Sequence, residues 1–140
     1  MEPRIVKGGR FADYRGVLSY NNDFDASQVK RIYFIENIDV NFIRAWQGHK
    51  IEQRWFSAVQ GSFEVKLIKV DNWETPSKTQ EPYVTTLNSE ILDILHVPAG
   101  YISSIQALVQ GAKLLVMADY LAGEIKDEYR YDAGYFNDNK

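Results

Sequence analysis

The chain has 140 residues and a net charge of −3 at pH 7. This length predicts a single domain, residues 1–140, that buries roughly two-thirds of the surface exposed by the unfolded chain. Charges of both signs are interspersed, so no basic stripe favours a nucleic-acid partner. The absence of cysteine excludes disulfides, thiolate catalysis and zinc–cysteine sites.

The sequence also contains no segment that resembles a targeting or membrane signal. The first residues include Glu2, Arg4 and Lys7 and form no apolar run of the kind found in signal peptides. No stretch has the length of uninterrupted apolar residues that a membrane helix needs. We therefore expect a cytoplasmic protein without a membrane partner.

Taken in chain order, the sequence predicts a series of short strands. Gly8-Gly9 interrupts the first residues, and the segments that follow are rich in β-branched and aromatic residues between turn signals. We predict extended segments at 13–20, 29–35, 40–46, 53–60, 62–70, 83–87, 91–97, 101–107 and 112–120. Gly61 predicts a hairpin between 53–60 and 62–70, and the polar segment 71–82, with Pro76 and Pro82, predicts a loop.

This pattern is typical of an all-β protein. Short strands that recur about every 8–12 residues between turn signals indicate a sandwich or a barrel. Residues 124–131 are the one candidate helix, and the chain from Phe136 onward is expected to be frayed. The predicted class is an all-β double-sheet jelly roll with a short helical or extended C-terminal tail.

Residues 44–52 gather most of the side chains that could perform chemistry, including one of only two histidines. In a regular strand, Arg44 and Trp46 would share one face, and Gln47 and His49 the other. A polar pair among apolar neighbours is either a hydrogen-bonded core pair or the floor of a pocket. Periodicity alone leaves both interpretations open.

These residues belong to a pattern that resembles the cupin superfamily of small jelly rolls. One cupin motif runs His-x-His, then Glu, then a Gly that opens a hairpin, and a second runs Pro-x-Gly-x-x-His. This chain has Gln47-Gly48-His49, then Glu52 and Gly61, and later Pro98-Ala99-Gly100-Tyr101-Ile102-Ser103. Each motif is recognisable, and each has lost one histidine.

More narrowly, the chain resembles the RmlC-like, WxcM-like branch of cupins, which includes sugar 3,4-ketoisomerases acting on nucleotide-linked 4-keto-6-deoxyhexoses. The matching segments follow the family's order over residues 9–131: Asp13-x-Arg15-Gly16-x-Leu18, Lys30–Ile35, Arg44 with its motif, and Met117–Tyr120 with Asp127–Arg130. The resemblance implies a double-stranded β-helix (cupin jelly roll). It also implies a cofactor-free isomerase or epimerase of deoxysugar and cell-surface polysaccharide biosynthesis, with a dTDP-linked sugar as the expected substrate.

The catalytic motif of the family is only partly retained. The family sequence Arg-Gly-x-His-Ala-His-Lys reads Arg44-Ala45-Trp46-Gln47-Gly48-His49-Lys50 here. The position that matches the base of related 3,5-epimerases is Gln47, whereas the histidine favoured as proton carrier in the ketoisomerases is retained as His49. The family's catalytic tyrosine matches Phe34, with Tyr33 beside it. The resemblance therefore implies His49 and Tyr33 as catalytic residues.

The chemistry of a ketoisomerase suits a histidine. A base must take an acidic C–H proton and return it to the neighbouring carbon, while donors stabilise the enediolate. The unperturbed pKa of histidine lies near neutral pH, so His49 is the natural candidate. The alternative for His49 is a core histidine hydrogen-bonded to Glu52 or to a backbone carbonyl.

The candidates for substrate binding carry a donor, a charge or an aromatic ring: Arg44, Arg15, Gln47, Glu52, Trp46, Tyr101 and Ser103. Arg44 and Arg15 could bind a pyrophosphate, or could form surface ion pairs. Gln47 can donate to a sugar oxygen but cannot act as a base. The aromatic rings could stack on a substrate or pack in the core. His96 is expected to be structural, and Lys50 and Arg54 are expected to be solvated charges.

No metal is expected, because a cupin metal site takes three histidines and a carboxylate and two of those positions hold Gln47 and Ser103. Three classes remain open: an isomerase or epimerase acting through His49, a non-catalytic cupin that binds a sugar or nucleotide, and a metal-dependent oxygenase. A nucleotide-linked sugar is the expected partner of the first two classes.

The N-terminal segment bears on the oligomeric state. The segment up to Tyr20 carries Phe11, Val17 and Leu18 but is too short to form its own layer. An uncovered edge strand is a liability, and related cupins exchange this strand across a two-fold axis. We therefore expect a homodimer formed through N-terminal strand exchange.

Overall fold

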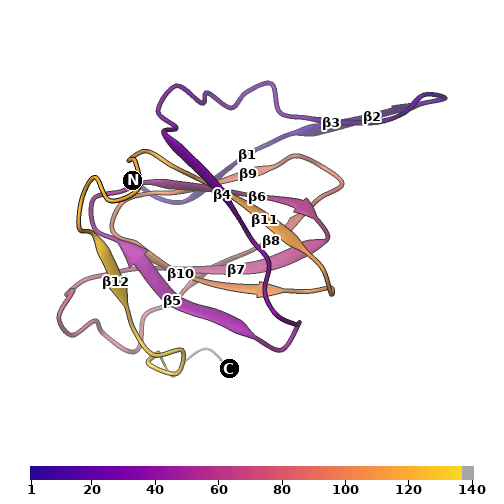
Figure 1. The fold of residues 1–140 in the computed structure, drawn as a ribbon. Coiled ribbons are helices and arrows are strands. Elements are labelled where there is room, and N and C mark those ends of the chain that lie inside the picture. The colour runs from indigo at the N-terminus through magenta and orange to yellow at the C-terminus, as the bar shows by residue number, and fades with distance from the viewer. Residues whose placement is uncertain (137–140) are drawn as a thin grey trace.

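The computed structural model describes residues 1–136 and contains two five-stranded antiparallel sheets and a separate two-stranded hairpin (Figure 1). The strand orders are β1-β9-β6-β11-β4 and β12-β5-β10-β7-β8, so most neighbours are distant in sequence. This arrangement confirms the all-β jelly roll. No helix occurs in the described part of the chain, and hence none long and apolar enough to cross a membrane.

The strands are short, as the turn signals indicated. Their bounds are β1 (Arg4–Val6), β2 (Gly9–Asp13), β3 (Gly16–Tyr20), β4 (Arg31–Ile35), β5 (Ile43–His49), β6 (Arg54–Gln60), β7 (Ser62–Lys69), β8 (Tyr83–Asn88), β9 (Ile94–Val97), β10 (Tyr101–Ala107), β11 (Lys113–Ala118) and β12 (Glu128–Arg130). The predicted loop at 71–82 contains no strand, and the predicted segment 101–107 coincides with β10.

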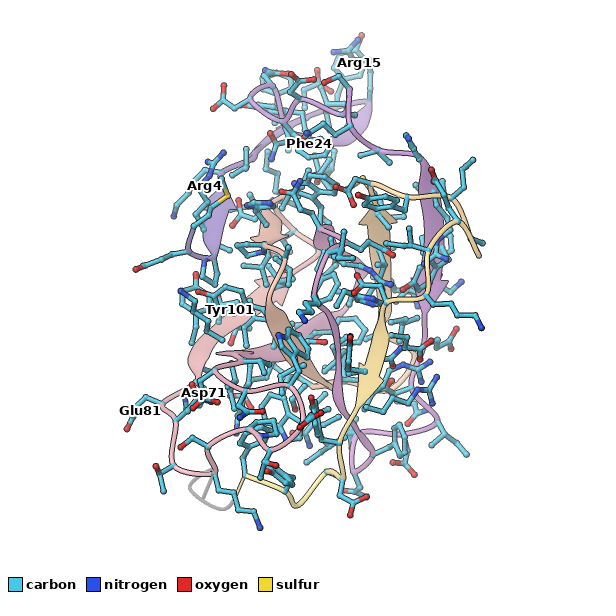
Figure 2. The ribbon with its side chains drawn as sticks, turned by 90° about the vertical axis from the view of Figure 1, so that its left-hand side faces the viewer. Arg4, Arg15, Phe24, Asp71, Glu81 and Tyr101 are labelled. Atoms are coloured by element: carbon cyan, nitrogen blue, oxygen red, sulfur yellow. The ribbon has the colours of Figure 1, made fainter. Side chains whose placement is uncertain are left out.

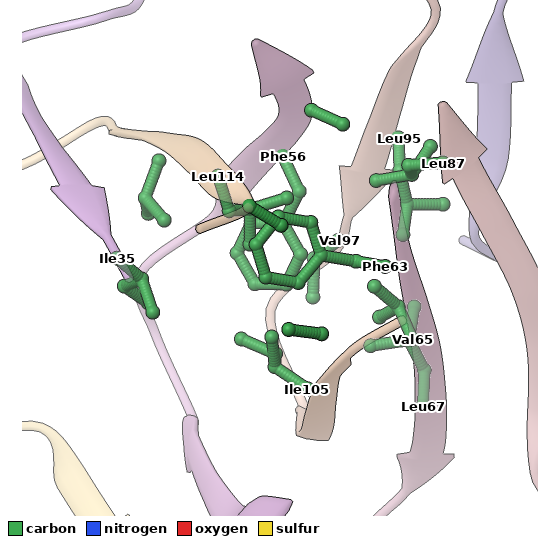
Figure 3. Packing of buried hydrophobic residues seen from close by; sticks show 14 of the residues in the cluster. Ile35, Phe56, Phe63, Val65, Leu67, Leu87, Leu95, Val97, Ile105 and Leu114 are labelled. Atoms are coloured by element: carbon green, nitrogen blue, oxygen red, sulfur yellow. The ribbon is translucent and has the colours of Figure 1, made fainter. Parts of the chain in front are cut away.

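The core lies between the two sheets and follows from the alternation within each strand. In β7, Phe63, Val65 and Leu67 are fully buried, and the charged residues between them are partly exposed. Apolar side chains from the first sheet, among them Phe56, Leu95 and Leu114, meet them in one cluster (Figure 3). Burying each such side chain stabilises the fold by about 1.5–3 kcal/mol.

The predicted hairpin at Gly61 is wrong in its pairing. β6 pairs with β9 and β11, whereas β7 pairs with β10 and β8, so the chain passes from one sheet to the other at this point. Gly61 has φ +71°, a conformation that favours glycine, and an added Cβ would lie 2.7 Å from the side chain of Val109. The glycine therefore permits a sharp crossing between layers.

The N-terminal region differs from the prediction in its boundaries. It contains β1 and then the β2–β3 hairpin, instead of one extended segment at 13–20. Gly16, with φ +136°, permits the tight turn, and Asp13 accepts a hydrogen bond from the backbone N–H of Arg15. The hairpin projects away from the two packed sheets, with Arg15 at its tip (Figures 1 and 2).

Of the two alternatives for the C-terminal tail, the structure has the extended one. Residues 124–131 are not helical, because β12 forms there and pairs with the edge of β5. The expected fraying is wrong for Phe136, which is fully buried and packs edge-to-face on Trp46 with ring centroids 5.2 Å apart. The rest of that expectation concerns residues 137–140, which lie outside the described part.

A matched pair of leucines tests the position of the core. Leu114 is 0% exposed between the sheets, whereas Leu108 is 46% exposed on the preceding loop. Leu114→Ala should lower the free energy of unfolding by about 2–5 kcal/mol, because it removes buried contacts and leaves a cavity. Leu108→Ala should change it by less than about 0.5 kcal/mol. Urea denaturation of both variants measures the difference, and equal losses would contradict the assigned core.

Candidate active site

A cavity of about 60 Å³ opens between the sheets at one end of the barrel. Its polar lining comes from β4, β5, β6 and β10 and from the turn after β5: Tyr33, Arg44, Gln47, His49, Glu52, Arg54, Tyr101 and Ser103. Apolar side chains of the main core, including Phe56 and Ile105, complete the lining. Polar groups that converge in a largely apolar pocket are typical of a small-molecule site.

His49 ends β5 and is buried, with one ring nitrogen engaged. Its Nδ1 lies 3.0 Å from the backbone carbonyl oxygen of Asp127. A carbonyl oxygen can only accept, so we assign the proton of the neutral ring to Nδ1 and the lone pair to Nε2. Nε2 has no hydrogen-bond partner in the described residues. The ring therefore has one nitrogen available to act as a base.

The carboxylate of Asp127 fixes the turn that follows His49. One oxygen accepts the backbone N–H of Lys50 at 3.0 Å, and the other accepts those of Ile51 and Glu52 at 2.8 Å each. Asp127 was not predicted as a site residue. The available signal was its place in a segment that resembles the family, but nothing in the local sequence indicates a contact across 78 positions.

The environment keeps His49 uncharged. Burial lowers the pKa of His49 to about 4, and the positive charge of Arg54 acts in the same direction. The Asp127 carbonyl and the charges of Asp127 and Glu128 oppose this shift without cancelling it. At neutral pH the imidazole is consequently in the form that can accept a proton.

Tyr33, Arg54 and Glu52 form a hydrogen-bonded chain in the same cavity. Arg54 donates to the hydroxyl of Tyr33 and, through Nε at 2.9 Å, to the carboxylate of Glu52. The prediction of a solvated Arg54 is wrong, because its side chain is only 11% exposed. Of the two partners considered for His49, a backbone carbonyl is present and Glu52 is not, because Glu52 pairs with Arg54 and, at 3.8 Å, with Arg31.

A β-bulge decides which residues of β5 face the cavity. Ser103 pairs with Gln47 and Ser104 pairs with Ala45, so Trp46 is the extra residue. The bulge breaks the strict alternation, and Arg44 lines the same cavity as Gln47 and His49. The prediction that Arg44 and Trp46 share a face is therefore wrong. Trp46, expected to bind substrate, is 2% exposed and packs in a different cluster outside this cavity.

The remaining lining residues supply donors. Tyr101 lies directly across from His49 in the β5–β10 pair, and burial raises the pKa of Tyr101, which keeps the hydroxyl protonated. Gln47 donates to Glu128 at 2.8 Å, and Ser103 donates to the Gln47 carbonyl at 3.3 Å. Arg44 is exposed and has no ion pair in the described part of the chain. Its guanidinium is available to an anion.

Two more residues discussed from the sequence lie outside the cavity: Arg15, a candidate for substrate binding, and His96, which was expected to be structural. Arg15 does not reach the cavity of its own chain: it sits at the hairpin tip, paired with Asp13 at 2.7 Å, far above Tyr101 in Figure 2. His96 lies outside the cavity, where it stacks on Trp55 and hydrogen-bonds Gln53 at 2.7 Å. Within residues 1–136, no three histidine or acidic side chains are grouped so that they could hold a metal ion.

This fold is shared with solved RmlC-type structures, and a family model assigns the chain. The family model described as "FdtA: WxcM-like, C-terminal" matches residues 1–140, and the chain belongs to this family. A search of curated proteins gave no match.

Solved structures share the fold at low sequence identity. A histidine-to-asparagine mutant of the 3,4-ketoisomerase QdtA from Thermoanaerobacterium thermosaccharolyticum, in complex with TDP-4-keto-6-deoxyglucose, is 22% identical, with a TM-score of 0.71 over 96% of this chain and 91% of that one. A 3,4-ketoisomerase from Helicobacter canadensis is also 22% identical, with a TM-score of 0.71 over 97% and 96%. The rmlC epimerase of Mycobacterium tuberculosis is 12% identical, with a TM-score of 0.72 over 94% and 70%.

The lowered pKa of His49 predicts a loss of stability in acid. The folded-state pKa of about 4 lies below the usual 6.5, so between these pH values the unfolded chain binds more protons. The free energy of unfolding should therefore fall as the pH decreases from 6.5 to 4, and less steeply in His49→Asn. The pKa of His96 is lowered too, so His96→Asn measures how much the other histidine contributes to the same loss. NMR titration should show His49 neutral down to about pH 4; titration near 6.5 would contradict the assignment.

Proposed function

We propose that the protein is an isomerase of a nucleotide-linked, dTDP-type 4-keto-6-deoxyhexose, with His49 as the base. The observation that carries this proposal is the neutral, buried His49 with Nδ1 on a carbonyl and Nε2 unpaired, in a cavity also lined by Tyr33. The ketoisomerases and epimerases that share the fold support the substrate class. No cofactor is needed for this chemistry.

In the proposed reaction, Nε2 of His49 removes the proton from C3, beside the C4 carbonyl. The resulting enediolate is protonated at C4 by the same imidazolium, while the C3 hydroxyl loses its proton and C3 becomes the carbonyl carbon. The Tyr33 hydroxyl, which receives a hydrogen bond from Arg54, carries a proton between the two oxygens. Tyr101 and Arg54 stabilise the charge that develops on oxygen.

The electrostatics of the free site change when substrate binds. Arg54 contributes to the low pKa of His49, and a bound diphosphate would offset part of the local positive charge. The basicity of His49 would then rise toward the value that proton transfer at neutral pH requires. Substrate binding would thus raise the pKa of His49 toward the range that suits a general base.

The rim of the cavity suits the rest of the substrate. Arg44 binds the diphosphate, because it is exposed, unpaired within the described residues and part of the cavity lining. Gln47 and Ser103 contact sugar oxygens. Glu52 acts indirectly by fixing Arg54.

One observation favours a second candidate function, a sugar- or nucleotide-binding cupin without turnover. Gln47 replaces the family's first histidine, and its amide is already hydrogen-bonded to Glu128. The same pocket would then bind a ligand with no proton transfer. Turnover separates the two functions.

Proton exchange in heavy water tests the isomerase. Wild-type protein with dTDP-4-keto-6-deoxyglucose should replace the C3 proton by deuterium, as followed by NMR. His49→Asn should slow this exchange on the order of 10²–10⁴-fold, because the base is lost. Its dTDP affinity should stay unchanged, since Arg44 is intact. Exchange that continues at the wild-type rate in His49→Asn would refute the assignment.

Two further variants serve as controls in the same assay. Arg44→Ala should weaken dTDP binding and leave the exchange rate at saturating substrate close to that of wild type. Gln47→His restores the family's first histidine. Activity gained by Gln47→His in an otherwise inactive protein would support the binding cupin as the present function.

The projecting hairpin supports a homodimer through N-terminal strand exchange, which we include in the proposal. Phe11, Val17 and Leu18 are each more than half exposed on the hairpin, and Ile32 and Phe34 are exposed on β4, the edge strand of the first sheet. Pairing of these surfaces between two copies would cover both. Arg15 would then act at the partner's site.

Two equally exposed leucines test this dimer. Leu18 is 59% exposed on the hairpin, and Leu121 is 58% exposed on the loop after β11. Leu18→Glu should shift the protein to monomer, because a charge would be buried in the interface. Leu121→Glu should leave the dimer intact. Analytical ultracentrifugation measures both; a monomeric wild type, or a dimeric Leu18→Glu, would exclude the hairpin interface.

A further inference from the structure

The outer face of the second sheet is covered by the end of the chain. A buried cluster separate from the main core joins Trp46 of β5 and Ile102 of β10 to Phe136. Aromatic residues from the 71–82 loop and the tail pack on it. We call the rings at this place the aromatic clasp: Trp46, Trp73, Tyr131, Tyr135 and Phe136.

Hydrogen bonds fix the geometry of the clasp. The Tyr131 hydroxyl donates to the Trp73 carbonyl at 2.6 Å, and the Tyr135 hydroxyl donates to the Pro76 carbonyl at 2.7 Å. Tyr131 and Trp46 exchange two backbone hydrogen bonds, at 2.9 and 3.0 Å. The Trp46 ring has no such bond, because its buried Nε1 lacks a partner in the described residues. Packing against Phe136 is therefore a main restraint on this ring.

The clasp lies next to β5, the strand that ends at His49. β12 pairs Glu128 with His49 and Arg130 with Gln47, and it connects the clasp directly to Asp127. On the other side of Asp127, residues 121–126 are exposed or half-buried and have no regular structure. The Asp127 carbonyl is thus held beside His49 from two sides: by the bonds of its own carboxylate to residues 50–52, and by the clasp through β12.

We infer that Phe136 is a positioning residue for His49. By packing on Trp46 it keeps β12 paired with β5, and this pairing keeps the Asp127 carbonyl on Nδ1. The ring proton then stays on Nδ1 and the lone pair stays on Nε2. The catalytic meaning of this inference rests on the proposed function, whereas its structural part does not.

NMR of the histidine ring nitrogens tests the inference without turnover. Since the chain has two histidines, His96→Asn assigns the signals. The wild-type His49 should show a single Nδ1–H tautomer. Phe136→Ala should give a mixture of tautomers and, in an active protein, a 10–100-fold slower C3 exchange, about the effect of losing an outer-shell partner. Phe136→Leu should restore much of the single Nδ1–H tautomer and much of the exchange rate.

The matched control is Leu87→Ala, which removes a fully buried side chain from β8, at the opposite edge of the same sheet. It should lower stability and leave the His49 tautomer unchanged. If Phe136→Ala does not fold, Tyr131→Phe, which removes only the bond to Trp73, takes its place in the NMR measurement. A single Nδ1–H tautomer in the folded clasp variants would overturn the inference. A tautomer change in a protein without turnover would uphold it and reject the isomerase.

Discussion

The site depends on one buried carboxylate. Asp127 accepts three successive backbone N–H groups from residues 50–52, and its carbonyl accepts the ring proton of His49. These bonds replace the water that the carboxylate loses on burial. Each N–H left without a partner would cost about 1–3 kcal/mol. The turn after β5, the pairing of β12 and the tautomer of His49 are therefore set together.

A bulge in β5 complements this constraint. By shifting the register between Ser103 and Ser104, it places Arg44 on the cavity side and Trp46 on the outer side. The same short strand thus supplies Arg44, the proposed anion contact at the cavity, and Trp46 of the aromatic clasp. A regular strand would have put Arg44 and His49 on opposite faces.

The sequence predicted the all-β fold well, because alternating burial is a local property. The inward residues of β7 and the bounds of β10 follow from it. Pairing is not local, so β6 and β7 were expected as a hairpin although they lie in different sheets. The family resemblance located the cavity around His49, Gln47 and Tyr101. Arg54 and Asp127 were missed, because their burial depends on contacts with residues far away in the sequence.

The central claim is that the sugar of a nucleotide-linked substrate enters the cavity beside His49 while its diphosphate contacts Arg44. A crystal structure of His49→Asn with dTDP-4-keto-6-deoxyglucose tests this most directly, since the variant should bind the substrate without converting it. We expect C3 of the sugar beside residue 49, the C4 oxygen near Tyr33 and the diphosphate on Arg44. A sugar bound outside this cavity, with Arg44 and residue 49 both free of ligand, would contradict the account.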